Sequence, residues 1–269
     1  MAMIENLGET GLRVLVFMFV FSVMSVFEFA LPRRKRALTR VRRWSTNLAI
    51  FGLATGLVRL LAFLAWPVAG AAAAIAAYEM GWGLFNWLDW PVWIELVLTI
   101  VLLDFFIWFQ HLASHHIQIL WRLHRVHHAD RDFDLTTALR FHPIEIALSA
   151  AYKFGLIFLL GPTAIAVITF EIILNGSAMF NHANARLPLW LDKILRQIIV
   201  TPDMHRVHHS VYKDEHDTNF GFFLSIWDRL FQTYSAQPRD GHDSMEIGLE
   251  KWRTDDPSKF TWSLLLPFR

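Results

Sequence analysis

The sequence predicts an all-α fold: an integral membrane helical bundle that carries a helical cap on the cytosolic side of the bilayer. Two observations predict it. The chain of 269 residues is 54% hydrophobic with a mean hydropathy of +0.34, whereas soluble domains are about 45–50% apolar, and the excess is concentrated in long runs. The second observation is that the 13 histidines are clustered along the chain, which indicates that the polar chemistry is concentrated at one site.

Four apolar stretches are long enough to cross a bilayer at least once, for which about 20 apolar residues are needed. Proline is poorly tolerated inside a helix, so the last stretch is expected to turn back at Gly161-Pro162 as a helical hairpin. The stretches are residues 12–31, residues 46–66 (interrupted by Arg59), residues 92–112 and residues 144–181.

The segments between these stretches set the expected orientation. Residues 32–44 carry seven Lys/Arg and no acid, so the positive-inside rule predicts that they stay cytosolic. The Ala-rich stretch 68–80 is short and is expected to be re-entrant or interfacial, and Trp82–Trp93 resembles an interfacial aromatic belt. The chain then re-enters at residue 92 and returns to the cytosol near His111. If residues 68–80 crossed the membrane completely, the number of crossings would change by one and His111 would lie on the side opposite to the basic segment.

These expectations divide the chain into three parts. Residues 1–91 would hold the N-terminal transmembrane helices and the basic cytosolic loop, and residues 92–234 the catalytic domain. Residues 235–269 would form a cytosolic or interfacial tail, in which 259–269 is an amphipathic candidate for lying on the bilayer. The stretch 182–269 contains no plausible span, so it is expected to form the cap.

Three histidine clusters carry the chemistry. Residues three and four positions apart share one helix face, so each cluster presents convergent imidazoles. Neutral imidazole suits iron, zinc, copper and nickel, and because one metal takes about four to six ligands, so many histidines indicate two metal ions. The clusters are His111 with His115, His124-Arg-Val-His127-His128, and His205-Arg-Val-His208-His209.

Polar residues near the clusters are candidates for orienting the ligands. Asp104 lies two helical turns before His111, and an ionisable group within a span is usually functional. Its carboxylate is expected either to accept the free ring N–H of a ligand histidine or merely to reach the interface. Glu145 and Asp130 are weaker candidates for the same role, and His142 is either a ligand or an orienting group.

The remaining histidines are expected to lie outside the centre. His116 is offset from the face that His111 and His115 share, and His216 and His242 are expected to be solvated. The chain has no cysteine, which excludes a disulfide framework, a thiolate metal site and a cysteine nucleophile. The apolar flanks of the basic segment argue against nucleic acid as a partner.

The location of the histidines favours an oxygenase. A site at a membrane face, next to apolar helices, is placed to receive a lipid, and lipids offer mainly C–H bonds, whose attack requires redox-active metal and O₂. Two alternatives remain open. A zinc-dependent membrane lipid hydrolase would be expected to carry a His-Glu-x-x-His arrangement, which this sequence lacks, and a non-enzymatic membrane metal-binding protein would distribute its polar residues along several spans.

The motifs together resemble the fatty acid hydroxylase/sterol desaturase superfamily, the membrane histidine-box di-iron oxygenases. The resemblance covers about residues 104–234. Two residues depart from the usual pattern: Gln232 stands where glycine is common, and Phe220 where tyrosine is usual. The matching stretches are Asp104–His115, Leu120–Asp130, Arg140–Glu145, Asn181–Asn184, Thr201–Ser210, Asn219–Gly221 and Trp227–Tyr234.

The resemblance implies a non-haem di-iron lipid monooxygenase or desaturase that acts on a sterol, a fatty acid or a related lipid. Its cofactors would be two iron ions, which zinc can replace in a structure, together with O₂ and an external electron donor. The donor would be a separate cytochrome b5-like or ferredoxin-like protein with its reductase. Asn184 joins Asp104, His142 and Glu145 as a candidate for surrounding the ligands. The implied metal ligands are His111, His115, His124, His127, His128, His182, His205, His208 and His209.

Overall fold

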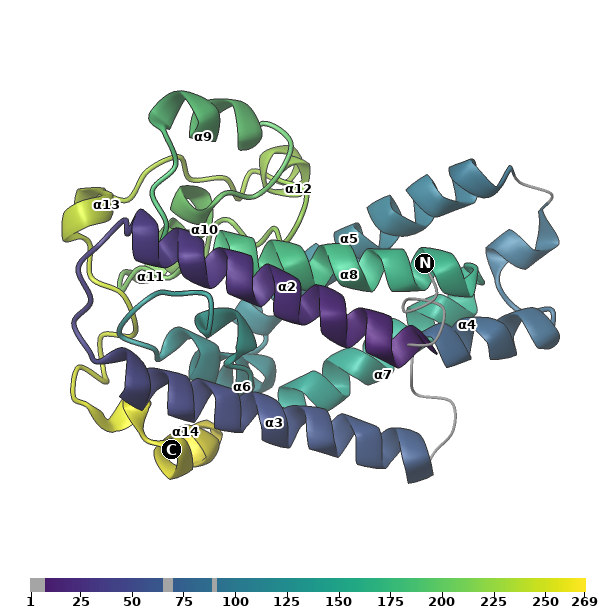
Figure 1. Ribbon diagram of the computed structural model, residues 1–269, viewed down its shortest axis with the longest axis horizontal. Coiled ribbons are helices and arrows are strands. Elements are labelled where there is room, and N and C mark those ends of the chain that lie inside the picture. Colours follow the sequence, from purple (N-terminus) through teal and green to yellow (C-terminus); the bar gives the residue numbers. More distant parts are fainter. Residues whose placement is uncertain (1–7, 65–69, 89–90) are drawn as a thin grey trace.

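The computed structural model describes residues 8–64, 70–88 and 91–269, and within these ranges the chain is helical and contains no β-strand (Figure 1). Five helices are long and apolar enough to cross a membrane. They confirm the predicted spans, including the hairpin, although the end of the second span lies outside the described residues. The five are α2 (Gly8–Ala30), α3 (Arg40–Leu64), α5 (Val92–His116), α7 (Pro143–Leu160) and α8 (Ala164–Asn181).

The hairpin of α7 and α8 has defined ends. At the start of α7, the ring of His142 accepts a hydrogen bond from the backbone N–H of Ile144 and Pro143 takes the first helical position, where its missing N–H costs nothing. At the other end, Gly161 adopts a left-handed conformation with φ 67°. A Cβ there would lie 2.7 Å from the carbonyl oxygen of Trp82, so the turn requires glycine.

The described part of the Ala-rich segment is too short a helix to span a bilayer core by itself. Helix α4 (Gly70–Glu79) has ten residues and is about 15 Å long, half the thickness of a bilayer core. Its Ala73 and Ala74 pack on Ile157 of α7 and Val167 of α8. The short helix η1 (Leu84–Trp87) follows. Residues 68–69 of the predicted re-entrant stretch and 89–90 of the predicted aromatic belt lie outside the described residues.

The rest of the chain forms a cap at one end of the bundle, on the left in Figure 1. Helix α6 (Gln118–His128) continues directly from α5. The C-terminal residues Leu249, Trp262 and Leu266 pack against α6 at Val126 and Ala129. The other elements are η2 (Thr137–Leu139), α9 (Leu189–Leu195), α10 (Pro202–His208), α11 (Lys213–His216), α12 (Ile226–Leu230), α13 (Gly241–Ser244), η3 (Asp256–Ser258), α14 (Phe260–Leu265) and η4 (Leu266–Phe268).

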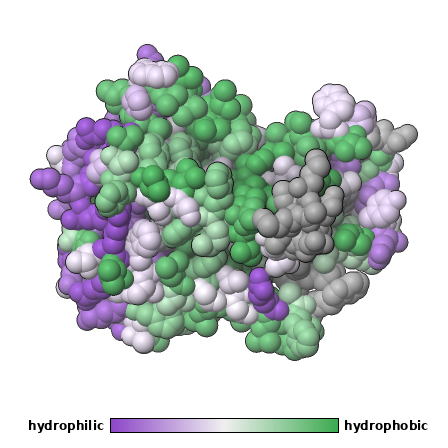
Figure 2. All heavy atoms as spheres, viewed as in Figure 1, coloured by the Kyte–Doolittle hydropathy of each residue, from purple (hydrophilic) through white to green (hydrophobic). Residues whose placement is uncertain are grey.

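The basic segment 32–44 lies against this cap. Arg33 forms ion pairs with Asp203 and Asp243, and Arg42 pairs with Asp255. The hydrophilic residues gather at this end of the molecule, at the left edge of Figure 2. The basic segment and the cap therefore lie on the same side of the bundle.

Arg43 forms the most buried of these contacts, and it corrects one expectation. Its guanidinium is 1% exposed and lies 2.7 Å from Asp130 and 2.5 Å from Asp134. Burial alone would raise the pKa of Asp130, but the Arg43 charge outweighs it and holds that pKa at about 2. Asp130 was a weak candidate for orienting a histidine, and it instead joins α3 to the cap.

Candidate metal centre

Nine buried histidines converge where α5, α6, α8 and α10 meet. Helix α5 contributes two, α6 three, the end of α8 one, and α10 with its last cap residue three. They form two groups, in each of which one ring nitrogen per residue lies within 4.8 Å of all the others. The first group is His111, His115, His124, His128 and His208; the second is His127, His182, His205 and His209.

Hydrogen bonds at Nδ1 set the tautomer of five of these rings. The Nδ1–H of His111 donates to the carbonyl oxygen of Phe220 at 2.7 Å, and that of His124 donates to Oε1 of Glu145 at 2.6 Å. His182 and His208 donate in the same way to the carbonyl oxygens of Ala178 and Thr218, and His115 to the carboxylate of Asp217. In a neutral imidazole with its proton on Nδ1, Nε2 carries a lone pair.

These lone pairs point at one another. Nε2 of His111 lies 3.1 Å from Nε2 of His124, and both atoms are acceptors, so no hydrogen bond joins them. Two nitrogen ligands at about 2.1 Å from one metal and at right angles are about 3.0 Å apart. The same 3.1 Å separates Nε2 of His182 from Nε2 of His127 and of His205. The donor set thus has the spacing of a ligand shell in both groups.

The other rings are held by packing. Nδ1 of His127, His128, His205 and His209 is buried without a hydrogen-bond partner among the described residues, as is Nε2 of His208. His127 stacks on Phe141 with ring centroids 4.3 Å apart. Its orientation is fixed although no acceptor holds it.

Burial keeps the imidazole rings in their neutral form. Desolvation, reinforced by neighbouring histidines, lowers the pKa of His127, His128, His205 and His209 well below the ordinary value. It lowers the pKa of His182 to about 3. Neutral imidazole is the form that binds metal, so the site is ready for cations at neutral pH.

Besides Asp130, the other four predicted orienting residues lie in different places. Glu145 contacts a histidine of the first group, as described. Asp104 does not orient a histidine: its carboxylate accepts hydrogen bonds from the backbone N–H groups of Phe223 and Leu224 and from the indole of Trp227. Asp104 lies in the middle of α5, and these hydrogen bonds join α5 to the cap.

His142 and Asn184 also have other partners. His142 caps α7, and its Nε2 contacts the carbonyl oxygen of Leu264, so it lies outside both groups. Asn184 exchanges hydrogen bonds with the backbone of Arg34. It fastens the basic segment beside His182 and does not contact a ligand ring.

Two histidines expected to be solvated are buried, which corrects that expectation. His242 lies 3.7 Å from Asp203. His216 stacks on Trp121 at 5.5 Å, and its ring centroid is 6.0 Å from that of His115. By contrast, His116 is exposed and contacts the carbonyl oxygen of Leu112.

An apolar cavity of about 300 Å³ opens onto the first group. It lies between α3, α5, α7 and α8, and it reaches His111, His124 and Glu145. Apolar side chains from all four helices line it, including Phe51, Val58, Ile107, Ile146 and Leu174. The cavity therefore runs from the ligand rings into the membrane-spanning bundle.

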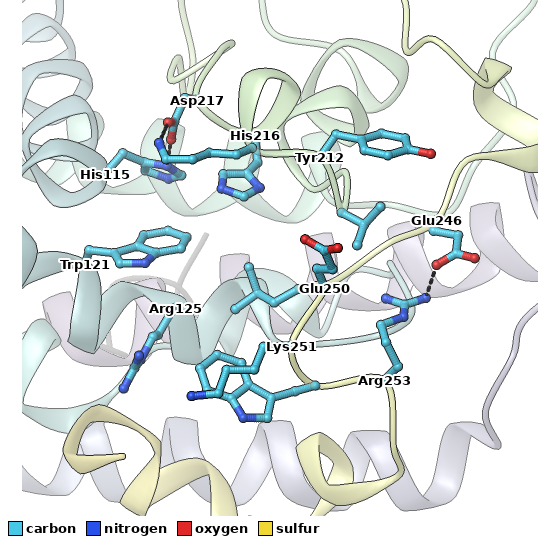
Figure 3. Close-up of a pocket in the computed structure, with 14 residues that line it drawn as sticks. His115, Trp121, Arg125, Tyr212, His216, Asp217, Glu246, Glu250, Lys251 and Arg253 are labelled. Carbon is cyan, nitrogen blue, oxygen red and sulfur yellow. Dashed lines mark hydrogen bonds and ion pairs between the residues drawn. The ribbon is translucent and has the colours of Figure 1, made fainter.

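A charged groove of about 590 Å³ approaches the same group through the cap. His115, Trp121 and His216 line its inner part, with Lys251 and Arg253 among the charged residues farther out (Figure 3). Lys213 pairs with Asp217, the residue that contacts His115. The first histidine group is thus reached from an apolar side and from a charged side.

Comparisons with known proteins agree with this site. An ornithine lipid hydroxylase from Rhizobium tropici is 28% identical over 238 residues, which are 87% of this chain and 70% of that protein. The alkylglycerol monooxygenase of Homo sapiens is 32% identical over 158 residues, 57% of this chain and 33% of that protein. A very-long-chain aldehyde decarbonylase from Oryza sativa subsp. japonica is 26% identical over 153 residues, 54% of this chain and 24% of that protein.

The chain thus spans about a third or less of the alkylglycerol monooxygenase and the decarbonylase that it matches. No solved structure matches it significantly. The family model described as fatty acid hydroxylase matches residues 96–233, which include all nine converging histidines. The chain therefore belongs to the fatty acid hydroxylase family.

Proposed function

We propose that this protein is an O₂-dependent lipid oxidoreductase, a hydroxylase or desaturase of a sterol, fatty acid or related lipid, that uses two iron ions held by the nine histidines. One observation carries the proposal. Nε2 atoms of buried, neutral imidazoles face one another at 3.1 Å, and an apolar cavity opens onto the first group. Such a site suits metal chemistry on an apolar substrate.

Iron is the metal that fits this chemistry. An all-imidazole site accepts iron, zinc, copper or nickel, so the nitrogen set alone does not choose between them. Iron supplies the activation of O₂ that attack on an unactivated C–H bond requires, which zinc does not supply. The activities for which the relatives are named, lipid hydroxylase and monooxygenase, support the choice of a redox-active metal.

The protein's own residues supply binding and orientation. The walls contributed by Phe51, Val58, Ile107 and Leu174 would bind an apolar chain or ring and exclude water. A substrate held there has one carbon next to His111 and His124, and such positioning converts part of the binding energy into reaction rate. Glu145 holds the ring of His124 in one tautomer while this occurs.

Electrons would come from a separate carrier on the cytosolic side, either cytochrome b5-like or ferredoxin-like with a reductase. The excess of Lys/Arg in residues 32–44 supports a cytosolic position for the cap. The charged groove supports an approach from that side, because it ends at His115. An electron carrier that docks at this groove would leave the apolar cavity free for the substrate.

Comparative lipid analysis tests the proposal. Cells that express the wild type would be compared, by mass spectrometry, with cells that express the double variant His127→Ala/His208→Ala, which removes one ligand from each group. His116→Ala, which removes an exposed histidine, is the matched control. We expect one lipid class to gain one oxygen or lose two hydrogens with the wild type and the control only. Identical lipid profiles in all three, with donor and candidate lipids present, would contradict the proposal.

A further inference from the structure

Helices α9 and α12 present an apolar surface that no described residue covers. We call it the α9–α12 surface; each of its large side chains is between 48% and 78% exposed. Figure 2 shows mainly apolar residues where Figure 1 places these two helices, away from the hydrophilic left edge. Monomeric soluble proteins rarely expose large contiguous patches of this kind. The surface consists of Leu189, Trp190, Ile194, Ile198, Ile226, Leu230 and Phe231.

Apart from the exposed Lys193, the polar side chains of the same helices point inward and are paired. Asp192 is buried, where it pairs with Arg196 and accepts a hydrogen bond from Thr201. The hydroxyl of Ser225 and the guanidinium of Arg229 donate to the carbonyl oxygen of Arg196. This polarity, with charges inside and apolar side chains outside, is the reverse of that of a helix facing water.

Backbone pairing joins the two helices into one unit. The N–H of Val200 donates to the carbonyl oxygen of Phe223, and the N–H of Ser225 donates to that of Ile198. Polar backbone that lies in hydrocarbon must be paired, because water is not available there. The connection between the two helices meets that condition at these positions.

The α9–α12 surface lies beside a membrane-spanning helix. Trp227 packs on Phe105 of α5 with ring centroids 5.1 Å apart, and Phe231 stacks on Trp108 at 4.7 Å. The indole N–H of Trp227 donates to Asp104, which lies more than three turns before the end of α5, about 18 Å along its axis. This part of the cap therefore lies alongside the apolar helix α5, which is long enough to span a membrane and exposes the ring of Phe109.

The arrangement of side chains on α9 indicates how it would lie. Trp190 and Ile194 lie four positions apart on α9, beside the exposed Lys193, and the exposed Ile198 and Gln197 follow in the turn after the helix. A helix in the plane of a bilayer buries its apolar row and keeps its cationic row among the headgroups. Tryptophan is enriched at that boundary.

We propose that the α9–α12 surface is inserted into the leaflet on the cap side of the bilayer. The cap is then a partly embedded structure that shares its apolar surface with α5. The inference concerns the seating of the cap and holds whatever reaction the metal centre performs.

Site-directed spin labelling tests this, and the cysteine-free chain allows single labels without other changes. Ile194→Cys and Leu230→Cys would be labelled and reconstituted in phosphatidylcholine vesicles. Leu53→Cys on α3 serves as the lipid-facing reference and Lys213→Cys on α11 as the aqueous reference, both being exposed. Collision rates with O₂, which concentrates in lipid, and with a water-soluble nickel chelate would be measured by power saturation.

We expect the labels at 194 and 230 to match that at 53, with a ratio of O₂ to nickel collisions several-fold above that at 213. A ratio equal to that at 213 overturns the proposal, and so does protection from both reagents, which would indicate a protein partner or a second copy. The unlabelled protein gives a second readout. Brominated lipids should quench the tryptophan fluorescence of the wild type more than that of Trp190→Phe, and equal quenching would count against insertion.

Discussion

A buried imidazole presents a lone pair to a metal only if its proton is held at the other ring nitrogen, and Glu145 does this for His124. The carboxylate oxygen lies 2.6 Å from Nδ1. Such partners fix the ring orientation and raise the basicity of the ligand. Glu145 lies 21 residues after His124 in sequence and belongs to α7, so tertiary packing brings it to the ring.

Removing this carboxylate should weaken metal binding. We expect Glu145→Ala to lower the affinity for a divalent metal about 10- to 100-fold, because the tautomer of His124 is no longer fixed. Glu145→Gln retains an acceptor oxygen and should lose less. Competition titration with a chromophoric chelator measures both, and Glu250→Ala, which removes an exposed glutamate of the charged groove, is the control. Equal affinities of Glu145→Ala and the wild type would contradict this role.

The buried histidines also predict how the metal-free protein responds to acid. Their pKa values are lowered by desolvation in the fold, as for His182 at about 3, and return to about 6.5 on unfolding. Below about pH 6.5 the unfolded chain therefore binds more protons than the folded one, so the free energy of unfolding falls as pH falls. At higher pH the two states bind equally few, and the loss is absent.

We therefore expect the metal-free protein to unfold at a distinctly lower temperature at pH 5.5 than at pH 7.5, followed by tryptophan fluorescence in detergent. Each such histidine contributes up to about 1.4 kcal/mol per pH unit within its window. His209→Gln should make the dependence shallower, whereas His116→Gln, at an exposed position, should not. A transition temperature that is unchanged between the two pH values would be inconsistent with neutral buried rings.

For individual residues, the sequence predicted which histidines gather at the site better than it predicted which residues contact them. The spacing of His124, His127 and His128 placed three imidazoles on one helix face, and the structure brings them to the centre. Asp217, which contacts His115, was not predicted, because nothing in its local sequence points to a residue on α5. His216 was predicted to be solvated because it lies outside the clusters, but the fold of α11 turns it toward Trp121.

At the scale of elements, Asp104 joins a spanning helix to the cap. Its carboxylate accepts hydrogen bonds from the segment 223–227, which precedes and enters α12. Asp228 continues the connection, since it accepts from the backbone N–H groups of Phe220 and Gly221 and from the indole of Trp108. The carbonyl oxygen of Phe220 accepts a hydrogen bond from His111, so these contacts also support the position of a histidine of the first group.

Replacing Asp104 should show whether this residue stabilises the fold or orients a metal ligand. We expect Asp104→Ala to lower the free energy of unfolding by about 2–4 kcal/mol, because buried donors lose their acceptor, while the number of metal ions bound per chain stays the same. Asp104→Asn retains an acceptor and should have a smaller effect. Thermal unfolding and metal analysis of the same samples provide the measurement. Loss of metal without loss of stability would instead return Asp104 to the role of orienting a histidine.

The elements themselves were largely predictable, and their ends were less so. Apolar length predicted the five spanning helices, and Gly161-Pro162 predicted the hairpin. The start of α3 at Arg40, inside the basic segment, was missed because the ion pairs of Arg43 with Asp130 and Asp134 are long-range contacts. Gln232 adopts φ 59°, a left-handed conformation that glycine favours, which accounts for glycine being common there in the superfamily that the sequence resembles.

At the scale of the whole molecule, the bundle and the cap enclose the histidines between two different environments. The apolar cavity lies on the side of the spanning helices, and the charged groove lies on the side of the cap (Figure 3). The basic segment 32–44 is held against the cap by ion pairs. The sequence could predict that the clusters meet at one membrane face, but not these two approaches, since they are formed by side chains from elements distant in the chain.

The central claim is that the nine histidines form two metal sites, and metal stoichiometry with X-ray absorption tests it most directly. Protein loaded with iron without oxygen should bind two ions per chain, each with a shell of nitrogen neighbours at about 2.1 Å. The variant His182→Ala/His209→Ala, which leaves the five-histidine group intact, should retain one ion. Saturation of the wild type at one ion or none per chain, or a shell without imidazole nitrogen, would contradict the account.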